Sequence, residues 1–355
     1  NLFLTLEGRE PELPPLLIGS HIDSQPNGGK FDGAYGVLAA LEAAQAISEW
    51  PERPRRSIEV VAWMNEEGSR FAPGMMGSAV FTGKRSLADI LPIKDRSGCS
   101  VKNALEMVLG AERDFPRRPM GFAVAGYLEA HIEQGTTLQQ EGCTAGIVTG
   151  IQGKRTFRVE IIGEESHAGT TPMDRRRDAA AAVAELILYV EKRAASVPQV
   201  VGTVGMLEVP AGSINVVPGR CRFSLDLRAT TDAARDACER DVRAELSRIC
   251  KTRGLQYTAE RTMIAAAAPS APAWQQRWER AVAALGLPLH RMPSGAGHDA
   301  MKLHEVLPQA MLFQRGLNAG ISHNPLESIT NDDTELTVRA FAHLLEQLAA
   351  DGGLA

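Results

Sequence analysis

Cysteine is scarce in this 355-residue chain, and its five residues are scattered. They stand at Cys99, Cys143, Cys221, Cys238 and Cys250, an odd number with no Cys-x-x-Cys spacing. This pattern argues against a disulfide framework and against a thiolate metal site. It is typical of reduced thiols, and we therefore expect a cytoplasmic protein.

Long apolar runs and a strong excess of one charge are lacking as well. The alanine-rich stretch Ala179–Ala195 is interrupted by Glu185 and Lys192, and no apolar run is long enough to span a bilayer. The net charge of −5 and a pI near 6.0 argue against nucleic-acid or anionic-membrane partners. The remaining composition, 44% apolar and 23% charged, is that of a globular protein with about two domains.

The first part of the chain predicts an open, mostly parallel α/β sheet. The chain begins at Asn1 without a signal-peptide pattern, and we expect that further residues precede it. Residues 16–19 and 57–64 form strand patterns that end in polar residues, with a helical pattern between them. Ligands of such sheets bind beyond the carboxyl ends of the strands. We therefore expect segments 19–36 and 65–68 to lie at one edge.

A second pattern begins after residue 150. Strand patterns at 156–163, 200–209, 221–228 and 256–264 are combined with helical patterns at 178–196 and 232–252. This β-α-β-β-α-β order is the ferredoxin-like arrangement. We predict that residues 153–264 form a domain inserted into a first domain made of residues 1–152 and 265–355.

Five nitrogen or oxygen donors stand at the ends of apolar runs or beside Gly or Pro turns. They are His21, Asp32, Glu67, His131 and His323. Such donors suit Zn²⁺ or Mn²⁺, and five fit two ions that share Asp32 as a bridging carboxylate. Two ions about 3.5 to 4 Å apart would hold and activate a hydroxide between them. Taken alone, the glycine-rich stretch around His21 is equally well explained as a polar turn.

Two further carboxylates stand beside these donors. Glu66 precedes Glu67, and a turn at Gly68 would allow both to serve one site. Glu66 would then take a proton from the bridging water and pass it to the leaving nitrogen. Asp23 lies two residues beyond His21 and is placed to accept the other ring N–H of that histidine.

Six motifs occur together over nearly the whole chain. They are His21-x-Asp23 with Asp32 following, Asn-Glu-Glu-Gly-Ser-Arg-Phe from Asn65, His-Ile-Glu-Gln-Gly from His131, Ser-His-Ala-Gly-Thr-Thr-Pro-Met from Ser166, Ser-Gly-Ala-Gly-His-Asp-Ala from Ser294, and Ser-His-Asn-Pro-Leu-Glu from Ser322. Together they resemble the hydantoinase/carbamoylase family of binuclear metal amidases. That family includes N-carbamoyl-L-amino acid hydrolases, allantoate amidohydrolases and β-ureidopropionases, and is related to di-zinc aminoacylases and exopeptidases.

The resemblance implies a role for each donor. His21, Asp32 and His131 would hold one metal ion, and Asp32, Glu67 and His323 the other. A histidine at position 131 is informative, because related peptidases usually have a carboxylate at that ligand. The first domain would thus be a di-metal catalytic domain, and the inserted one a lid and dimerisation domain.

The resemblance also implies catalytic and substrate-binding residues. Glu66 would be the general base, and His167 would reach the active site of the partner subunit in a homodimer and stabilise the oxyanion. The implied substrate-binding residues are Gln134 near the substrate amide, Asn215 and Arg228 at the substrate carboxylate, and the backbone of Gly295 and Ala296.

Taken alone, the residues of the inserted domain have plainer interpretations. Arg228 ends an apolar strand and is suited to a bidentate grip on a carboxylate, but a salt bridge with Asp226 explains it as well. Asn215 also suits a turn, and His167 suits a hydrogen-bonded loop histidine. His298 and Asp299 are interpreted as structural.

These observations predict a metal-dependent amidohydrolase with two divalent ions per subunit. It would cleave the ureido C–N bond of an N-carbamoyl-L-amino acid to the free amino acid, CO₂ and ammonia. The ions would be Zn²⁺ or Mn²⁺, with Co²⁺ or Ni²⁺ as further candidates. Hydrolysis of allantoate or of another ureido acid such as N-carbamoyl-β-alanine is the alternative. A di-zinc exopeptidase or aminoacylase, and a catalytically inactive dimerisation module, are more distant ones.

Overall fold

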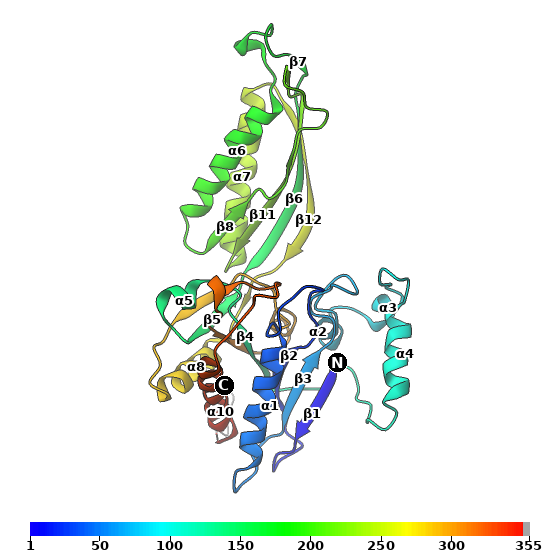
Figure 1. Cartoon of the computed structure of the whole chain (residues 1–355), viewed down its shortest axis with the longest axis vertical. Coiled ribbons are helices and arrows are strands. Elements are labelled where there is room, and N and C mark those ends of the chain that lie inside the picture. Colours follow the sequence, from blue (N-terminus) through cyan, green and yellow to red (C-terminus); the bar gives the residue numbers. More distant parts are fainter. Residues whose placement is uncertain (351–355) are drawn as a thin grey trace. The chain divides into compact units, whose positions relative to one another are not determined.

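The computed structural model describes residues 1–350 and separates into two compact units (Figure 1). The first unit contains Asn1–Ile151 and the part of the chain that begins at Pro269, and the second unit is Gln152–Ala268. The sequence places the insertion at residues 153–264. The assignment of catalysis to the first unit, and of lid and dimerisation functions to the second, remains a prediction.

The first unit is built around a sheet of eight strands. Its order is β1 (Leu2–Leu6), β3 (Ile58–Trp63), β2 (Leu16–His21), β4 (Gly126–Ile132), β15 (Gln309–Gln314), β5 (Ala145–Ile151) and β13 (Ala268–Pro269), with β14 (Arg291–Ser294) paired to β5. Strands β3, β2, β4 and β15 are parallel neighbours. Strand β1 pairs antiparallel with β3, and β15 pairs antiparallel with β5. The predicted mostly parallel sheet is therefore confirmed.

Helices account for the burial of this sheet. Every residue of β2, β3, β4 and β15 is buried, as in parallel sheets covered on both faces. The helices α1 (Ala34–Ser48), α8 (Pro272–Ala284) and α10 (Asn331–Ala350) pack side by side and share one apolar core with the strands (Figure 1). The shorter helices are α2 (Met76–Phe81), α3 (Leu87–Ile90), α4 (Val101–Ala111), α5 (Thr137–Glu141) and α9 (Ala300–Leu303).

The second unit has two helices on an antiparallel sheet. The sheet order is β12 (Gln256–Ala265), β6 (Gly153–Ile162), β11 (Arg220–Ala229) and β8 (Val200–Thr203). Helices α6 (Ala179–Ala195) and α7 (Asp232–Thr252) pack against each other and against the alternate strand residues Phe157, Val159 and Ile161. The observed order of elements is the β-α-β-β-α-β order that the sequence predicts.

The short strands of the second unit could not be predicted from sequence patterns. The strand predicted at 200–209 is divided into β8 and the two-residue β9 (Leu207–Glu208), both paired with β11. A two-stranded antiparallel sheet of β7 (Ser166–His167) and β10 (Val216–Val217) was not predicted at all. Strands of two to four residues contain too few positions for a period of two to be recognised.

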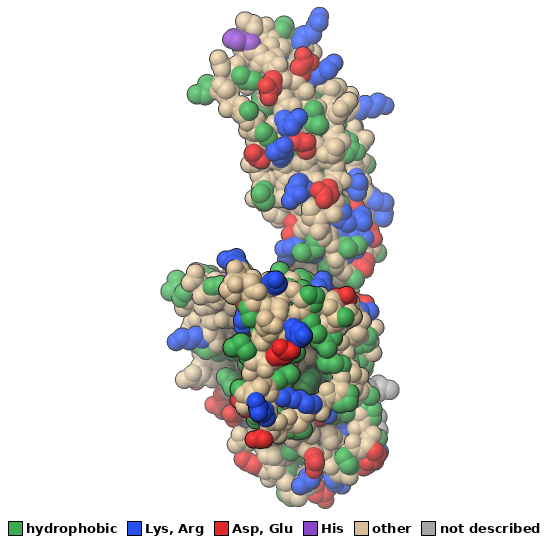
Figure 2. Space-filling view, turned by 90° about the vertical axis from the view of Figure 1, so that its right-hand side faces the viewer, with side chains coloured by type: hydrophobic (Ala, Val, Ile, Leu, Met, Phe, Trp, Pro, Cys, Tyr) green, Lys and Arg blue, Asp and Glu red, His purple; other side chains and the backbone are tan. Residues whose placement is uncertain are grey.

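The helices, the cysteines and the surface charges of the described chain agree with what its composition predicts. Within residues 1–350, no helix combines the length and the apolar character needed to cross a membrane. All five cysteines are free thiols. Side chains of Lys and Arg are interspersed with those of Asp and Glu on the face shown in Figure 2, as expected for a chain of nearly balanced charge.

Candidate metal centre

The five predicted donors meet at one edge of the parallel sheet. His21 ends β2, His131 lies near the end of β4, and Glu67 follows β3. Asp32 lies in the loop before α1, and His323 lies in the loop after β15. Because the four strands are parallel neighbours, their carboxyl ends place these side chains together.

A first donor group is fully buried. It consists of His21, Asp32 and His131, whose donor atoms all lie within 4.8 Å of one another. Asp32 Oδ1 is 3.6 Å from His21 Nε2 and 3.2 Å from His131 Nε2. These are the three residues that the sequence assigns to one metal ion.

A second donor group reaches the protein surface. It consists of Asp32, Glu67 and His323, and the His323 side chain is 50% exposed. His323 Nε2 lies 3.1 Å from Asp32 Oδ2 and 3.4 Å from Glu67 Oε2. Asp32 thus offers Oδ1 to the first group and Oδ2 to the second, which is the arrangement that a bridging carboxylate needs.

The donor atoms fit divalent cations. Both groups consist of imidazole nitrogens and carboxylate oxygens, the donors that Zn²⁺ and Mn²⁺ accept. Oε1 of Glu67 is buried and has no hydrogen-bond partner in the described chain. A buried carboxylate oxygen without a partner is costly, and a bound cation would compensate for it.

The groups shift one another's protonation. Burial alone would raise the pKa of Asp32, but the hydrogen bond from His131 and the neighbouring histidines lower it well below its usual value. Burial alone would lower the pKa of His131, but its hydrogen bond and attraction to Asp32 raise it to about 9. Burial and the charge of His131 lower the pKa of His21.

Glu66 lies beside the first group. Its Oε2 atom is 3.7 Å from His21 Nε2, and its side chain is 9% exposed. Burial raises the pKa of Glu66 to about 10, assisted by the negative charges of Asp299 and Glu129. A cation in the adjacent donor groups would act in the opposite direction and favour the carboxylate.

The turn that presents Glu66 and Glu67 contains the predicted Gly68 and begins at Asn65. Asn65 has a φ of 54° and Gly68 a φ of 69°, so both are in the left-handed region. Asparagine tolerates this conformation because its short side chain can bond locally. Here the Asn65 side-chain amide donates to Phe71 O (2.7 Å) and its oxygen accepts from Phe71 N (3.3 Å).

The predicted contact between the Asp23 carboxylate and His21 is replaced by another. His21 Nδ1 lies 2.9 Å from the backbone oxygen of Asp23, whereas the carboxylate oxygen Oδ1 is 3.7 Å away. The carboxylate instead accepts hydrogen bonds from the backbone N–H groups of Glu66 (3.0 Å) and Glu67 (3.1 Å). Asp23 therefore supports His21 through its backbone and the Glu66 turn through its side chain.

Gln134 contacts the bridging residue directly. Its Nε2 atom donates to Asp32 Oδ2 (2.9 Å) and to Ser322 Oγ (3.1 Å). The predicted contact with a substrate amide remains a prediction. The backbone of Gly295 and Ala296, also predicted to meet the substrate, follows β14 directly. Ser294, the last residue of β14, donates from its Oγ to Ala296 O (2.9 Å).

Three further titratable side chains are buried near the donors. Glu129 and Asp299 are fully buried, burial raises the pKa of both, and each keeps one carboxylate oxygen without a hydrogen-bond partner in the described chain. His298 is buried against His131, with ring centroids 4.5 Å apart, and its Nε2 shares a hydrogen bond with Ser294 Oγ (2.9 Å). The sequence interpretation overlooked Glu129, which lies inside a strand with no motif of its own.

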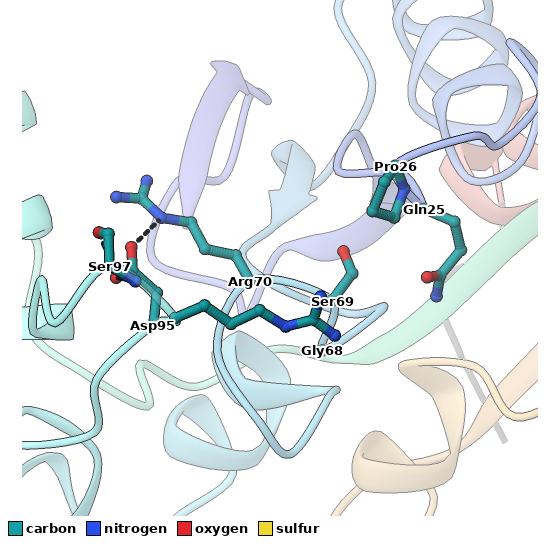
Figure 3. Close-up of a pocket in the computed structure, with 8 residues that line it drawn as sticks. Gln25, Pro26, Gly68, Ser69, Arg70, Asp95 and Ser97 are labelled. Atoms are coloured by element: carbon teal, nitrogen blue, oxygen red, sulfur yellow. Dashed lines mark hydrogen bonds and ion pairs between the residues drawn. The ribbon is translucent and has the colours of Figure 1, made fainter.

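A cavity of about 430 Å³ adjoins the second donor group. Gln25, Gly68, Ser69 and Arg70 contribute to its lining (Figure 3). Gln25 Nε2 donates to Glu67 Oε2 (2.8 Å), so the cavity is one side chain away from a predicted metal ligand.

The second unit holds three predicted residues at two places. His167 and Asn215 are at the two-stranded β7–β10 sheet, where His167 pairs with Val216 and Ala168 N donates to Asn215 O (2.9 Å). Arg228 lies near the far end of β11 and donates to both carboxylate oxygens of Asp226 (3.1 and 3.0 Å). The salt bridge with Asp226 that was considered as the alternative for Arg228 is thus present. The role of Arg228 in binding the substrate remains a prediction.

Comparison with known proteins now identifies the family. The sequence pattern described as peptidase family M20/M25/M40 matches residues 17–347. The chain belongs to this family. It is 39% identical over 353 residues to an N-carbamoyl-L-amino acid amidohydrolase of Geobacillus stearothermophilus, which covers 98% of this chain and 85% of that protein. It is 36% identical over 361 residues to an allantoate amidohydrolase of Bacillus subtilis, with 98% and 84% covered.

Solved structures of hydantoinase/carbamoylase family amidases are similar to this M20 chain as well. A hydantoinase/carbamoylase family amidase from Burkholderia multivorans superimposes with a TM-score of 0.92 and 37% identity, over 98% of this chain and 84% of that one. The family predicted from the six motifs is therefore confirmed. The chain is an enzyme of the amidohydrolase type.

Proposed function

We propose that this protein is a metal-dependent N-carbamoyl-L-amino acid amidohydrolase. It would hydrolyse the ureido C–N bond to the free amino acid, CO₂ and ammonia. The observation that carries the proposal is the pair of donor groups sharing Asp32 beside the buried Glu66. The similarity to the amidohydrolase of Geobacillus stearothermophilus supports the choice of substrate.

The two donor groups would hold two divalent ions per subunit, Zn²⁺ or Mn²⁺, with Co²⁺ or Ni²⁺ as further candidates. One ion would be held by His21, Asp32 and His131, and the other by Asp32, Glu67 and His323. When bound, such ions polarise a carbonyl and lower the pKa of water near them.

Glu66 would carry the proton. Its carboxylate would accept a proton from the attacking water and then donate it to the nitrogen that leaves when the C–N bond breaks. Its side chain is buried and lies beside His21, which would limit exchange of this proton with bulk water.

The geometry of the second unit supports a homodimer. Arg228 stands eight residues along β11 from Arg220, which corresponds to about 26 Å of strand. His167 and Asn215 lie at the two-stranded β7–β10 sheet beyond the Arg220 end of that strand. One small substrate cannot contact both places of a single subunit, so His167 and Asn215 would serve the active site of the partner subunit. This extends to Asn215 the role that the resemblance implies for His167 alone.

A second candidate substrate is allantoate. The allantoate amidohydrolase of Bacillus subtilis is 36% identical to this chain, compared with 39% for the carbamoyl amino acid enzyme of Geobacillus stearothermophilus, and each match covers 98% of this chain. A dipeptide substrate is disfavoured by His131, which occupies the ligand position that usually holds a carboxylate in the related peptidases.

The cytoplasmic location expected from the cysteines also remains a prediction.

A substrate panel tests the proposed function. The purified protein, loaded with Mn²⁺ or with Zn²⁺, is incubated with N-carbamoyl-L-amino acids, N-carbamoyl-β-alanine, allantoate and dipeptides, and ammonia and free amine are measured. We expect release of both products from N-carbamoyl-L-amino acids, loss of activity on chelation and recovery when the ion is returned. Cleavage of dipeptides alone would refute the amidohydrolase assignment, and cleavage of allantoate alone would select the second candidate.

A further inference from the structure

We propose that Glu327 is a positioning residue that ties the loop of Asp32 to the loop of His323 and so sets the geometry of the second donor group. The inference rests on the proposed metal centre but not on the identity of the substrate. Glu327 was not among the predicted site residues, although it ends the Ser-His-Asn-Pro-Leu-Glu motif. Its side chain is buried, with the residue only 6% exposed.

One oxygen of Glu327 holds the Asp32 loop. Oε1 accepts hydrogen bonds from the backbone N–H groups of Phe31 (2.8 Å) and Asp32 (3.0 Å). These bonds fix the backbone from which the bridging carboxylate projects. Hydrogen bonds to an ionised acceptor are among the stronger ones in proteins, so the loop is held firmly at the residue that both donor groups share.

The other oxygen of Glu327 holds the His323 loop. Oε2 accepts from Ser322 Oγ (2.7 Å), and Ser322 directly precedes His323. Ser322 Oγ in turn lies 3.3 Å from Asp32 Oδ2. The backbone N–H of Glu327 also donates to Asn324 O (3.0 Å), which closes the turn after the histidine.

Both ligands need such support because neither projects from a regular element. Asp32 lies before the first residue of α1, and His323 has a left-handed φ of 55° and a half-exposed side chain. Ligands on loops are held less accurately than ligands on strands or helices unless neighbouring groups fix them. Gln134 bonds to the side chains of Asp32 and Ser322, whereas Glu327 bonds to the backbone of the Asp32 loop and to Ser322.

Gly29 provides a second way to test the contact. A Cβ atom at Gly29 would lie 2.1 Å from Glu327 Oε1 and 2.2 Å from its Cδ atom. A side chain at position 29 would therefore push the carboxylate away from Phe31 and Asp32. Gly29→Ala disturbs the position of Glu327 without removing its charge.

The experiment compares the binding of Mn²⁺ to metal-free proteins by calorimetry. We expect the second equivalent of Mn²⁺ to bind about 10- to 100-fold more weakly to Glu327→Ala than to the wild type. Gly29→Ala should weaken it in the same direction, and Glu327→Gln, which keeps one acceptor oxygen, should lie between Glu327→Ala and the wild type. Glu335→Ala, which removes an exposed glutamate of α10, is the matched control and should bind as the wild type.

A spectroscopic readout separates positioning from general stability. The visible absorption of the Co²⁺-loaded protein reports ligand geometry, and it should change in Glu327→Ala and Gly29→Ala but not in Glu335→Ala. Wild-type Mn²⁺ affinity and an unchanged Co²⁺ spectrum in Glu327→Ala would overturn the inference. If that variant does not fold, the same result in both Glu327→Gln and Gly29→Ala would overturn it.

These readouts use no substrate, so they are independent of the proposed reaction. A protein that hydrolyses none of the ureido compounds, but whose Glu327 variants lose Mn²⁺ affinity, would refute the proposed function and support the role of Glu327. A wild-type protein that binds no Mn²⁺, Zn²⁺ or Co²⁺ would overturn the role of Glu327.

Discussion

Asp32 and Glu66 have opposite protonation preferences although both are buried carboxyl groups within a few ångströms of His21. Asp32 is surrounded by His21, His131 and His323, and these hold it in the charged form. Burial raises the pKa of Glu66, and the negative charges of Asp299 and Glu129 raise it further. A buried carboxyl group is therefore suited to metal binding at position 32 and to proton transfer at position 66.

Replacing Glu66 with glutamine tests the proton carrier. The amide keeps the size of the side chain but cannot accept and release a proton. We expect Glu66→Gln to lower kcat by about 10²- to 10⁴-fold, the usual contribution of general acid–base catalysis. Metal content, measured by elemental analysis, should stay at the wild-type level. Wild-type turnover in this variant would remove Glu66 from the mechanism.

The same shifts predict how pH affects the metal-free protein. Glu66 keeps its proton in the folded state up to pH about 10, whereas an unfolded glutamate loses it near pH 4.5, so folding is progressively disfavoured as pH rises between these values. His131, with a folded pKa of about 9, contributes stability that is complete below its unfolded pKa near 6.5 and is lost as pH rises through 9.

The titrations of Glu66 and of His131 both lower the stability of the folded protein as the pH rises. The metal-free protein should unfold at a lower urea concentration at pH 9 than at pH 6. Glu66→Gln should reduce this difference but not abolish it, because His131 still titrates. A metal-free protein that is equally stable at both pH values, or more stable at pH 9, would contradict these assignments.

At the scale of elements, the start of α1 is placed directly against a predicted ligand. Gly33, which caps this helix, has a φ of 65°, and a Cβ atom there would lie 2.3 to 2.4 Å from three atoms of the His21 imidazole. The backbone nitrogen of Gly33 also lies 3.2 Å from His131 Nε2. The close approach of helix and strand that builds the first donor group therefore requires glycine at this position.

Gly33→Ala tests this packing. The positive φ at this sparsely populated backbone conformation costs a non-glycine residue about 1 to 3 kcal/mol, and displacement of His21 should also weaken metal binding. The control is Gly110→Ala in α4, where nothing lies within 4 Å of the added Cβ, and where alanine should stabilise the helix by about 0.5 to 1 kcal/mol. Urea unfolding and Mn²⁺ calorimetry measure both effects. Equal behaviour of the two variants would show that Gly33 is not constrained.

At the scale of the whole molecule, the proposed homodimer explains why the predicted substrate contacts lie at two distant places of the second unit. If His167 acts in the active site of the partner subunit and Arg228 in its own, the two functions can be complemented. His167→Ala and Arg228→Ala homodimers should each be almost inactive. A mixed dimer should contain one intact site, so random mixing should restore about a quarter of wild-type activity.

Mixing the two variants and measuring ammonia release carries out this test. The control is each variant mixed with itself under the same conditions of dissociation and reassociation. Absence of recovered activity from well-mixed dimers would place His167 and Arg228 in the same site. A monomer in sedimentation experiments would contradict the homodimer itself.

Part of the donor set could be predicted from sequence because three of the ligands lie at or just after the end of an apolar strand. His21, Glu67 and His131 are positioned by β2, β3 and β4, and parallel strands bring their carboxyl ends together without further information. The order of elements in the second unit followed from alternating and helical periods in long segments. Strands of two to four residues were missed or merged, since they are too short to show a period.

The sequence by itself determined the family, the mostly parallel sheet, and the residue types that gather at its edge. Only the tertiary structure decided which atoms meet there: the backbone oxygen of Asp23 on His21, the left-handed turn at Asn65, and the carboxylate of Glu327 between the loops of Asp32 and His323. Glu327 and Asp32 are 295 residues apart. Periodic patterns report local backbone geometry, whereas hydrogen bonds between distant loops depend on how those loops pack, and no local pattern encodes that.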